Sequence, residues 1–170
     1  MLAGGHPNSL GRTVEVVDAV LTDPPRFDEL LACYESEDEV VRLRTSNALK
    51  RVEKERHDLL VPRIEHLLGP MARIDQPSTQ WTLAQLLLRL TDDMDALQRE
   101  RAKALVLANL RASNDWIVLN ASMEALAAWS RDDGALANDL RLELERLSGD
   151  DRKSVAGRAR RLLLKLPPPD

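Results

Sequence analysis

Apolar side chains recur along this chain at the spacing of an α-helix. Phe27, Leu30, Leu31 and Tyr34 stand at i, i+3, i+4 and i+7, which places them on one side of a helix. Similar stripes predict nine helices separated by short segments rich in Pro, Gly and Asp. We expect the first helix near 9–22, with an apolar face of Val14, Val17 and Leu21, a fourth near 58–69 and the last ending at Leu166.

Polar residues mark the predicted helix starts. Ser36 followed by Glu39 fits a capping box, and Asn114 is predicted to cap a later helix. The aspartate pairs Asp92-Asp93, Asp132-Asp133 and Asp150-Asp151 also stand at predicted starts. The unpaired N–H groups and the dipole of a helix start favour negative charge. We therefore interpret these pairs as caps rather than as acid–base catalysts.

The apolar pattern itself repeats along the chain. Val41, Thr79, Val118 and Val155 begin the same stripe four times, in steps of 38, 39 and 37 residues. Such a period is typical of stacked helix pairs, none of which can bury its apolar face alone. The repeats are predicted at 24–55, 58–91, 93–130 and 133–166. The helix near 9–22 is predicted to cap a single domain over 9–166, with flexible ends at 1–8 and 167–170.

The first repeat resembles a HEAT repeat. In residues 27–52, an apolar helix leads to the acidic turn Glu37-Asp38, and the next helix carries Val41-Arg42 and Ala48-Leu49. The third repeat keeps Asn114, Asp115, Val118, Ala125 and Leu126. Resemblance to HEAT-repeat α-solenoids implies an all-α, right-handed α–α superhelix of about four pairs, whose second helices line the concave side. It also implies a scaffold or adaptor role.

Composition excludes several classes of fold and function for this chain. Aromatic residues make up only 3% of the 170 residues, which is scarce for a β-rich fold. The net charge of −4 disfavours a duplex-binding domain, because neutralising phosphates requires cations. A lone cysteine, Cys33, excludes an internal disulfide and a two-cysteine zinc site. The sequence has neither a secretory leader nor an apolar stretch of membrane-spanning length, so we expect a cytoplasmic protein without a membrane partner.

Signs of catalysis are sparse. His57 and His66 have Asp58 and Glu65 beside them, but the sequence has no HExxH motif, Gly-rich phosphate loop or GxSxG elbow. We interpret the histidines as surface residues at helix ends and Cys33 as a residue at the core boundary. We therefore expect no metal, no cofactor and no enzymatic activity.

The repeat phase predicts a polar groove with one basic edge on the second helices. Its predicted lining is Asn47, Arg51, Trp81, Gln85, Arg89, Asn120, Glu124, Arg161 and Lys165. Trp and Arg often dominate interface energies, so Trp81 is a candidate anchor. A solvated face, with Trp81 packed on a neighbouring repeat, is the other interpretation.

The last helix is strongly basic. Its cations are Arg152, Lys153, Arg158, Arg160, Arg161 and Lys165. They either bind an acidic partner or a phosphate, or form the solubilising outer face that a terminal repeat needs.

These features predict a non-catalytic scaffold that binds another macromolecule, in the first place a protein, as a monomer or weak homo-oligomer. One alternative is a nucleic-acid-binding protein similar to the HEAT-like alkylation-repair DNA glycosylases. Its basic track would be Arg44, Arg51, Arg89, Arg158 and Lys165, with Trp81. Another alternative is a lyase similar to the HEAT-like phycobilin lyases.

Overall fold

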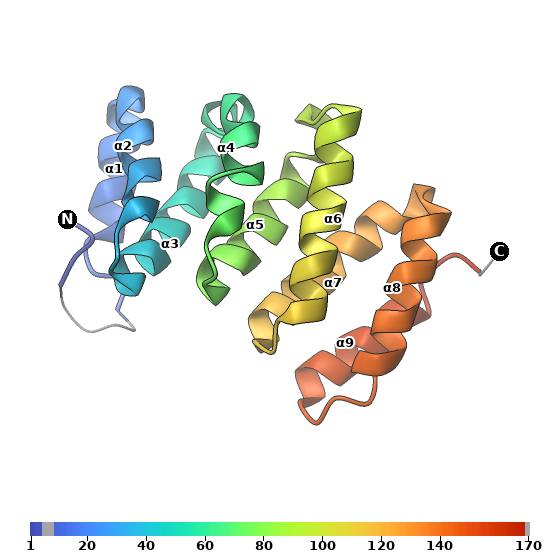
Figure 1. The fold of residues 1–170 in the computed structure, drawn as a ribbon. Coiled ribbons are helices and arrows are strands. Elements are labelled where there is room, and N and C mark those ends of the chain that lie inside the picture. Colours follow the sequence, from blue (N-terminus) through green and yellow to red (C-terminus); the bar gives the residue numbers. More distant parts are fainter. Residues whose placement is uncertain (5–8, 169–170) are drawn as a thin grey trace. The chain divides into compact units, whose positions relative to one another are not determined.

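The chain is helical throughout the residues that the structure describes. The computed structural model describes residues 1–4 and 9–168, and within these ranges the regular elements are nine α-helices and seven short 3₁₀ turns, without a strand (Figure 1). This confirms the all-α prediction. Over the same ranges, no helix combines the length and the apolar character needed to cross a lipid bilayer.

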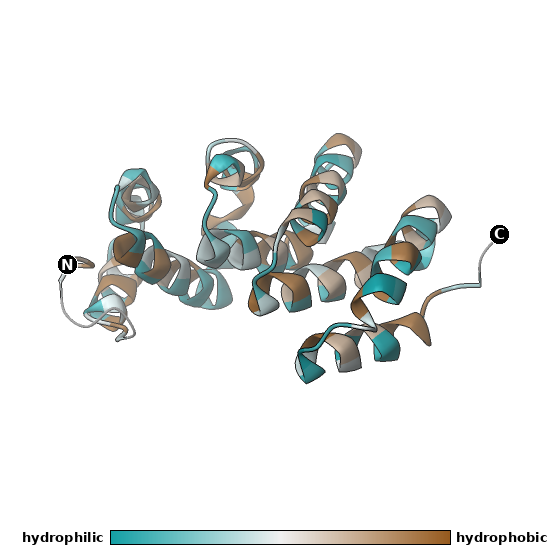
Figure 2. Cartoon of the chain, turned by 60° about the horizontal axis from the view of Figure 1, so that its bottom comes forward, coloured by the Kyte–Doolittle hydropathy of each residue, from teal (hydrophilic) through white to brown (hydrophobic). Residues whose placement is uncertain are grey.

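Two compact units divide the chain, Met1–Thr82 and Leu83–Asp170. Helix α5 (Pro77–Arg89) begins in the first unit and ends in the second. Each helix carries both hydrophobic and hydrophilic residues along its length (Figure 2). The apolar positions are therefore distributed as expected for helices with one buried side.

The first unit is built around α3 (Glu39–Glu55). Both α1 (Thr13–Thr22) and α2 (Phe27–Ala32) pack against α3, and α4 (Ile64–Leu68) follows two 3₁₀ turns. The buried core of this unit includes Val17, Val20, Phe27, Leu30, Leu31, Leu49, Val52, Leu60 and Leu67.

The second unit contains two complete helix pairs. Helices α6 (Ala96–Ala112) and α7 (Trp116–Trp129) form one pair, and α8 (Gly134–Leu147) and α9 (Lys153–Leu163) form the next. Helix α7 also packs on α9, and α6 contacts α8, so the two pairs stack in sequence order. The core between these helices includes Val106, Leu110, Val118, Leu126, Leu140, Leu144, Val155 and Leu162.

The turns before α3 and α7 have the same local structure, 77 residues apart. Asp38 accepts a hydrogen bond from the N–H of residue 40 at 2.8 Å, and Asp115 accepts one from the N–H of residue 117 at the same distance. The hydroxyls of Ser36 and Ser113 accept the N–H of these aspartates, at 3.2 and 3.1 Å. These two turns therefore share the same pattern of serine and aspartate hydrogen bonds.

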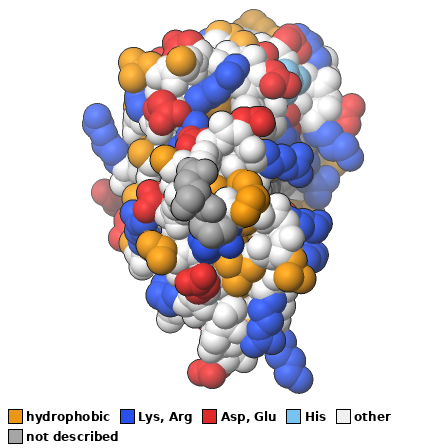
Figure 3. Space-filling view, turned by 90° about the vertical axis from the view of Figure 1, so that its right-hand side faces the viewer, with side chains coloured by type: hydrophobic (Ala, Val, Ile, Leu, Met, Phe, Trp, Pro, Cys, Tyr) orange, Lys and Arg blue, Asp and Glu red, His pale blue; other side chains and the backbone are white. Residues whose placement is uncertain are grey.

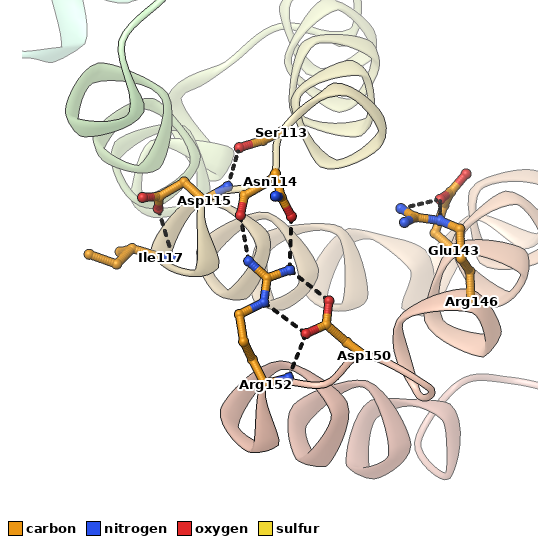
Figure 4. A network of polar contacts seen from close by, with 8 residues as sticks. All are labelled: Ser113, Asn114, Asp115, Ile117, Glu143, Arg146, Asp150 and Arg152. Carbon is orange, nitrogen blue, oxygen red and sulfur yellow. Dashed lines mark hydrogen bonds and ion pairs between the residues drawn. The ribbon is translucent and has the colours of Figure 1, made fainter.

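In each unit, one side chain also ties a turn to another turn that lies 37 or 38 residues earlier. In the first unit, Gln76 donates to the carbonyl of Glu39 at 2.9 Å. In the second unit, Arg152 donates to the carbonyl of Asn114 and, at 3.1 Å, to its side-chain oxygen (Figure 4). Gln76 and Arg152 each stand directly before the second helix of a pair. These bonds reach back 37 and 38 residues, which is one repeat.

Four predicted caps are wrong by one to three residues. One of them is Asp150-Asp151, because the N-cap of α9 is Arg152, which makes no side-chain cap bond. Helix α3 is capped by Asp38 rather than by a Ser36–Glu39 box, and α7 is capped by Asp115 rather than by Asn114. Helix α6 is capped by Asp95, which forms a capping box with Gln98, whereas Asp92-Asp93 lies in a 3₁₀ turn. Only the residue directly before the first helical turn can present its side chain to the unpaired N–H groups.

The fourth predicted helix is shorter than the predicted 58–69. Two 3₁₀ turns, His57–Leu59 and Val61–Arg63, precede α4, and Pro62 lies in the second of them. Proline has no N–H to donate to the carbonyl four residues earlier, so one continuous α-helix is disfavoured here.

The ends of the helical region also differ from the prediction. Helix α1 begins at Thr13 rather than near 9, and it buries Thr13, Val17 and Val20 while Val14 remains 50% exposed. The buried face is therefore rotated from the predicted one. Helix α9 ends at Leu163 rather than at Leu166. Of the predicted flexible ends, 5–8 and 169–170 lie outside the described residues.

Candidate functional site

The predicted groove residues fall in both units. Asn47 and Arg51 lie on α3 in the first unit, and Asn47 donates its side-chain amide to the carbonyl of Leu43 at 3.2 Å. Trp81 is half-buried on α5. The remaining predicted residues, Gln85, Arg89, Asn120, Glu124, Arg161 and Lys165, belong to the second unit. The candidate site is built from this second group.

Three of the predicted groove residues, Gln85, Asn120 and Glu124, line the same hollow of about 260 Å³. It is lined by Gln85, Leu88, Trp116, Ile117, Asn120, Ala121, Glu124 and Arg158. The lining comes from the end of α5, from the first turns of α7 and from α9. Trp116 is 51% exposed, so a large aromatic ring stands open to solvent at this hollow.

A second hollow, of about 180 Å³, adjoins the first because Leu88 and Glu124 line both. Its other lining residues are Ala127, Ala128, Arg131, Leu162, Lys165 and Leu166. The two hollows together form the candidate site, which we call the α7–α9 face. Lys165, from the predicted groove, lies here, whereas Arg89 lines neither hollow.

Cations surround a single carboxylate on the α7–α9 face. One oxygen of Glu124 accepts hydrogen bonds from Arg158 at 2.9 Å and from Arg161 at 2.6 Å. Arg131 and Lys165 line the second hollow. Four cations and one carboxylate leave a local charge of +3 in a chain whose net charge is −4.

These guanidinium groups remain accessible. The side chains of Arg158, Arg161 and Glu124 are 34, 55 and 39% exposed. Ion pairs at such exposure are screened by water and contribute at most about 1 kcal/mol to stability. A ligand carboxylate can therefore reach the arginines without dismantling a strong internal contact. Lys and Arg side chains predominate along the right-hand edge of the view in Figure 3.

Asn120 is the unusual polar residue of the face. It is only 6% exposed, and its Oδ1 atom has no hydrogen-bond partner among the described residues. A buried acceptor without a partner costs about 1–3 kcal/mol of folding free energy. An apolar residue of similar size, such as Leu, would avoid this cost at the same position.

Across residues 1–4 and 9–168, no three His, Cys, Asp or Glu side chains are grouped to hold a metal ion. His57 contacts Glu53 through Nδ1 at 3.0 Å. Burial raises the pKa of the Cys33 thiol, which keeps this group in its less reactive protonated form.

Two predicted cations are engaged elsewhere. Arg44 is only 1% exposed, and its guanidinium donates to the carbonyls of Leu2, Gly4 and Ser9. Placing Arg44 on a nucleic-acid track was therefore wrong, because phosphate cannot reach it. Arg152 holds the turn of Figure 4, where it pairs with Asp150 at 2.6 Å.

Trp116 and Arg131 line the face but were absent from the predicted groove, and Arg158 was noted only as part of the basic helix. Trp116 precedes Asn120 by four residues on α7, which puts both on one side of the helix. That spacing was the available sequence signal for Trp116.

Comparisons with protein-family models, with curated proteins and with solved structures gave no match for this chain.

Proposed function

We propose that this protein is a non-catalytic, HEAT-like scaffold that binds an acidic segment of a partner protein on the α7–α9 face. The observation that carries the proposal is the local charge of +3 around two adjoining hollows, in a chain of net charge −4. Opposite charge on a partner steers its approach and selects it against basic competitors.

The apolar part of the face supports a protein ligand over a nucleic acid. Leu88, Ile117 and Leu162 line the hollows, and the exposed Trp116 ring offers a rigid contact surface. Trp and Arg are enriched among residues that dominate protein–protein binding energy. A continuous row of phosphates would meet the Glu124 carboxylate, whereas a peptide can alternate carboxylates with apolar side chains.

The scaffold part of the proposal extends the repeat through the whole chain. We propose that the four helix pairs form a right-handed α–α superhelix. Support comes from the turn-to-turn bonds of Gln76 and Arg152, one in each unit, which reach back 37 and 38 residues. Stacked pairs present their second helices as a continuous surface, which is the usual binding surface of such proteins.

A binding experiment with defined probes tests this function. Fluorescein-labelled short peptides of Glu, Asp and Leu are compared with peptides in which Lys replaces each acidic residue, and with duplex DNA. Fluorescence polarisation should show that an acidic peptide binds, that the Lys peptide does not, and that affinity falls as salt rises. Binding of the Lys peptide as tightly as the acidic one, or binding of DNA alone, would overturn the proposal.

Matched variants locate the binding. Arg161 and Arg146 are 55 and 54% exposed, and each forms an ion pair with one glutamate, but Arg146 lies on α8 away from the hollows. We expect Arg161→Glu to lower affinity for the acidic peptide about tenfold, roughly 1.4 kcal/mol, and Arg146→Glu to change it little. Equal losses in both variants would show that only net charge matters, which contradicts a local site.

A further inference from the structure

We infer that the first hollow binds the main chain of an extended peptide through the side-chain amides of Asn120 and Gln85. This inference rests on the proposed function and adds to it the conformation of the bound segment. Both amides line the same hollow, Asn120 from α7 and Gln85 from α5.

The side-chain oxygen of Asn120 is available to accept a hydrogen bond from a ligand. Oδ1 lacks a partner among the described residues, although the side chain is almost completely buried at the hollow. The terminal torsion of an Asn side chain is broad, so a small rotation can turn the amide toward the hollow. A ligand N–H would then supply the missing hydrogen bond.

The chemistry of an amide selects the ligand group. An Asn or Gln side chain offers a carbonyl acceptor and an NH₂ donor side by side, and these complement the N–H and C=O of a peptide unit. In a helical ligand these backbone groups already bond to each other along the helix. An extended segment leaves them free, so two amides in one hollow favour an extended chain.

The charged residues complete the arrangement. Arg158 lines the same hollow as the two amides, and Arg161 reaches the same Glu124 oxygen. In an extended chain, alternate side chains point to the same side. A carboxylate next to the paired peptide unit can therefore reach the arginines, while a neighbouring apolar side chain contacts Trp116.

Replacing single backbone N–H groups in the peptide tests this directly. The strongest acidic peptide from the first experiment is remade with an ester in place of each amide in turn, which removes one donor. With the wild-type protein, one position should lose about tenfold in affinity. In Asn120→Leu, the amide and ester peptides should bind equally at that position, because the acceptor is absent.

Ser122→Ala provides the control variant. Ser122 is also fully buried on α7, and its hydroxyl has no partner in the part of the chain that the structure describes. It lines neither hollow, so its variant should keep the ester effect. An acidic peptide that binds with no ester-sensitive position, or with one that persists in Asn120→Leu, overturns the inference and leaves the proposed function standing. Failure of every acidic peptide to bind removes both.

Discussion

Folding and binding place opposing demands on the side chain of Asn120. In the unbound protein its Oδ1 atom is buried and has no hydrogen-bond partner within residues 1–4 and 9–168, which lowers the free energy of unfolding. In the proposed complex the same atom accepts a hydrogen bond. Residues selected for binding often cost stability in this way, and replacing them tends to stabilise the fold.

Asn120→Leu should therefore stabilise the free protein. The change removes an unpaired acceptor and adds apolar contact on α7, and we expect the free energy of unfolding to rise by about 1 kcal/mol. Urea denaturation followed by circular dichroism measures it. A loss of stability would show that the amide is hydrogen-bonded in solution, which contradicts an unpaired Oδ1 that awaits a ligand N–H.

The contact between Asp150 and Arg152 gives a residue-scale prediction about pH. The side-chain hydrogen bond from Arg152 lowers the pKa of Asp150 to about 2, from an ordinary value of 3.8. Because the folded pKa lies below the unfolded one, this contact stabilises the fold fully above pH 3.8 and is lost as the pH falls toward 2.

We expect wild type to be more stable than Asp150→Asn at neutral pH, and the difference between them to shrink as the pH falls below 3.8. Unfolding curves of both proteins at a series of acidic pH values measure it. A difference that stays constant, or that grows in acid, would contradict the depressed pKa.

Replacing two glycines by alanine should have opposite effects on the stability of the elements that contain them. Gly157 lies inside α9, and a Cβ atom added there meets no atom within 4 Å. Gly11 has a φ of +53°, and a Cβ there would lie 2.9 Å from the guanidinium carbon of Arg44. Helix interiors favour Ala over Gly, whereas positive φ disfavours any side chain.

Gly157→Ala should raise the free energy of unfolding by about 0.5–1 kcal/mol, and Gly11→Ala should lower it. Thermal unfolding of the two variants beside wild type checks both signs. Stabilisation by Gly11→Ala would mean that the segment before α1 does not hold its conformation against Arg44 in solution.

Sequence reasoning performed best on elements with long apolar stripes. The stripe beginning at Val118 marked α7, because burial of a whole helical face leaves a strong periodic signal. The caps were harder, since Asn114 and Asp115 are both good caps and only the backbone decides between them. The stripe around Ile64 gave no hint that Pro62 shortens α4.

At the scale of the whole molecule, the spacing of the sequence repeat predicted part of the candidate site. Gln85 and Glu124 were predicted to line the groove, and both line the first hollow. Repeat phase did not predict Trp116, which is the first residue of α7. The engagement of Arg152 in a turn was also unforeseen, since composition alone does not separate a structural arginine from a binding one.

The proposed function requires an acidic peptide to contact the α7–α9 face of this protein. Two-dimensional amide NMR of the isotope-labelled protein, titrated with the acidic peptide, measures this residue by residue. We predict that the largest shift changes fall on Trp116–Glu124 of α7 and on the Arg158–Lys165 segment that includes the end of α9. Shift changes confined to α6, to α8 or to the first unit would contradict the α7–α9 face as the binding site.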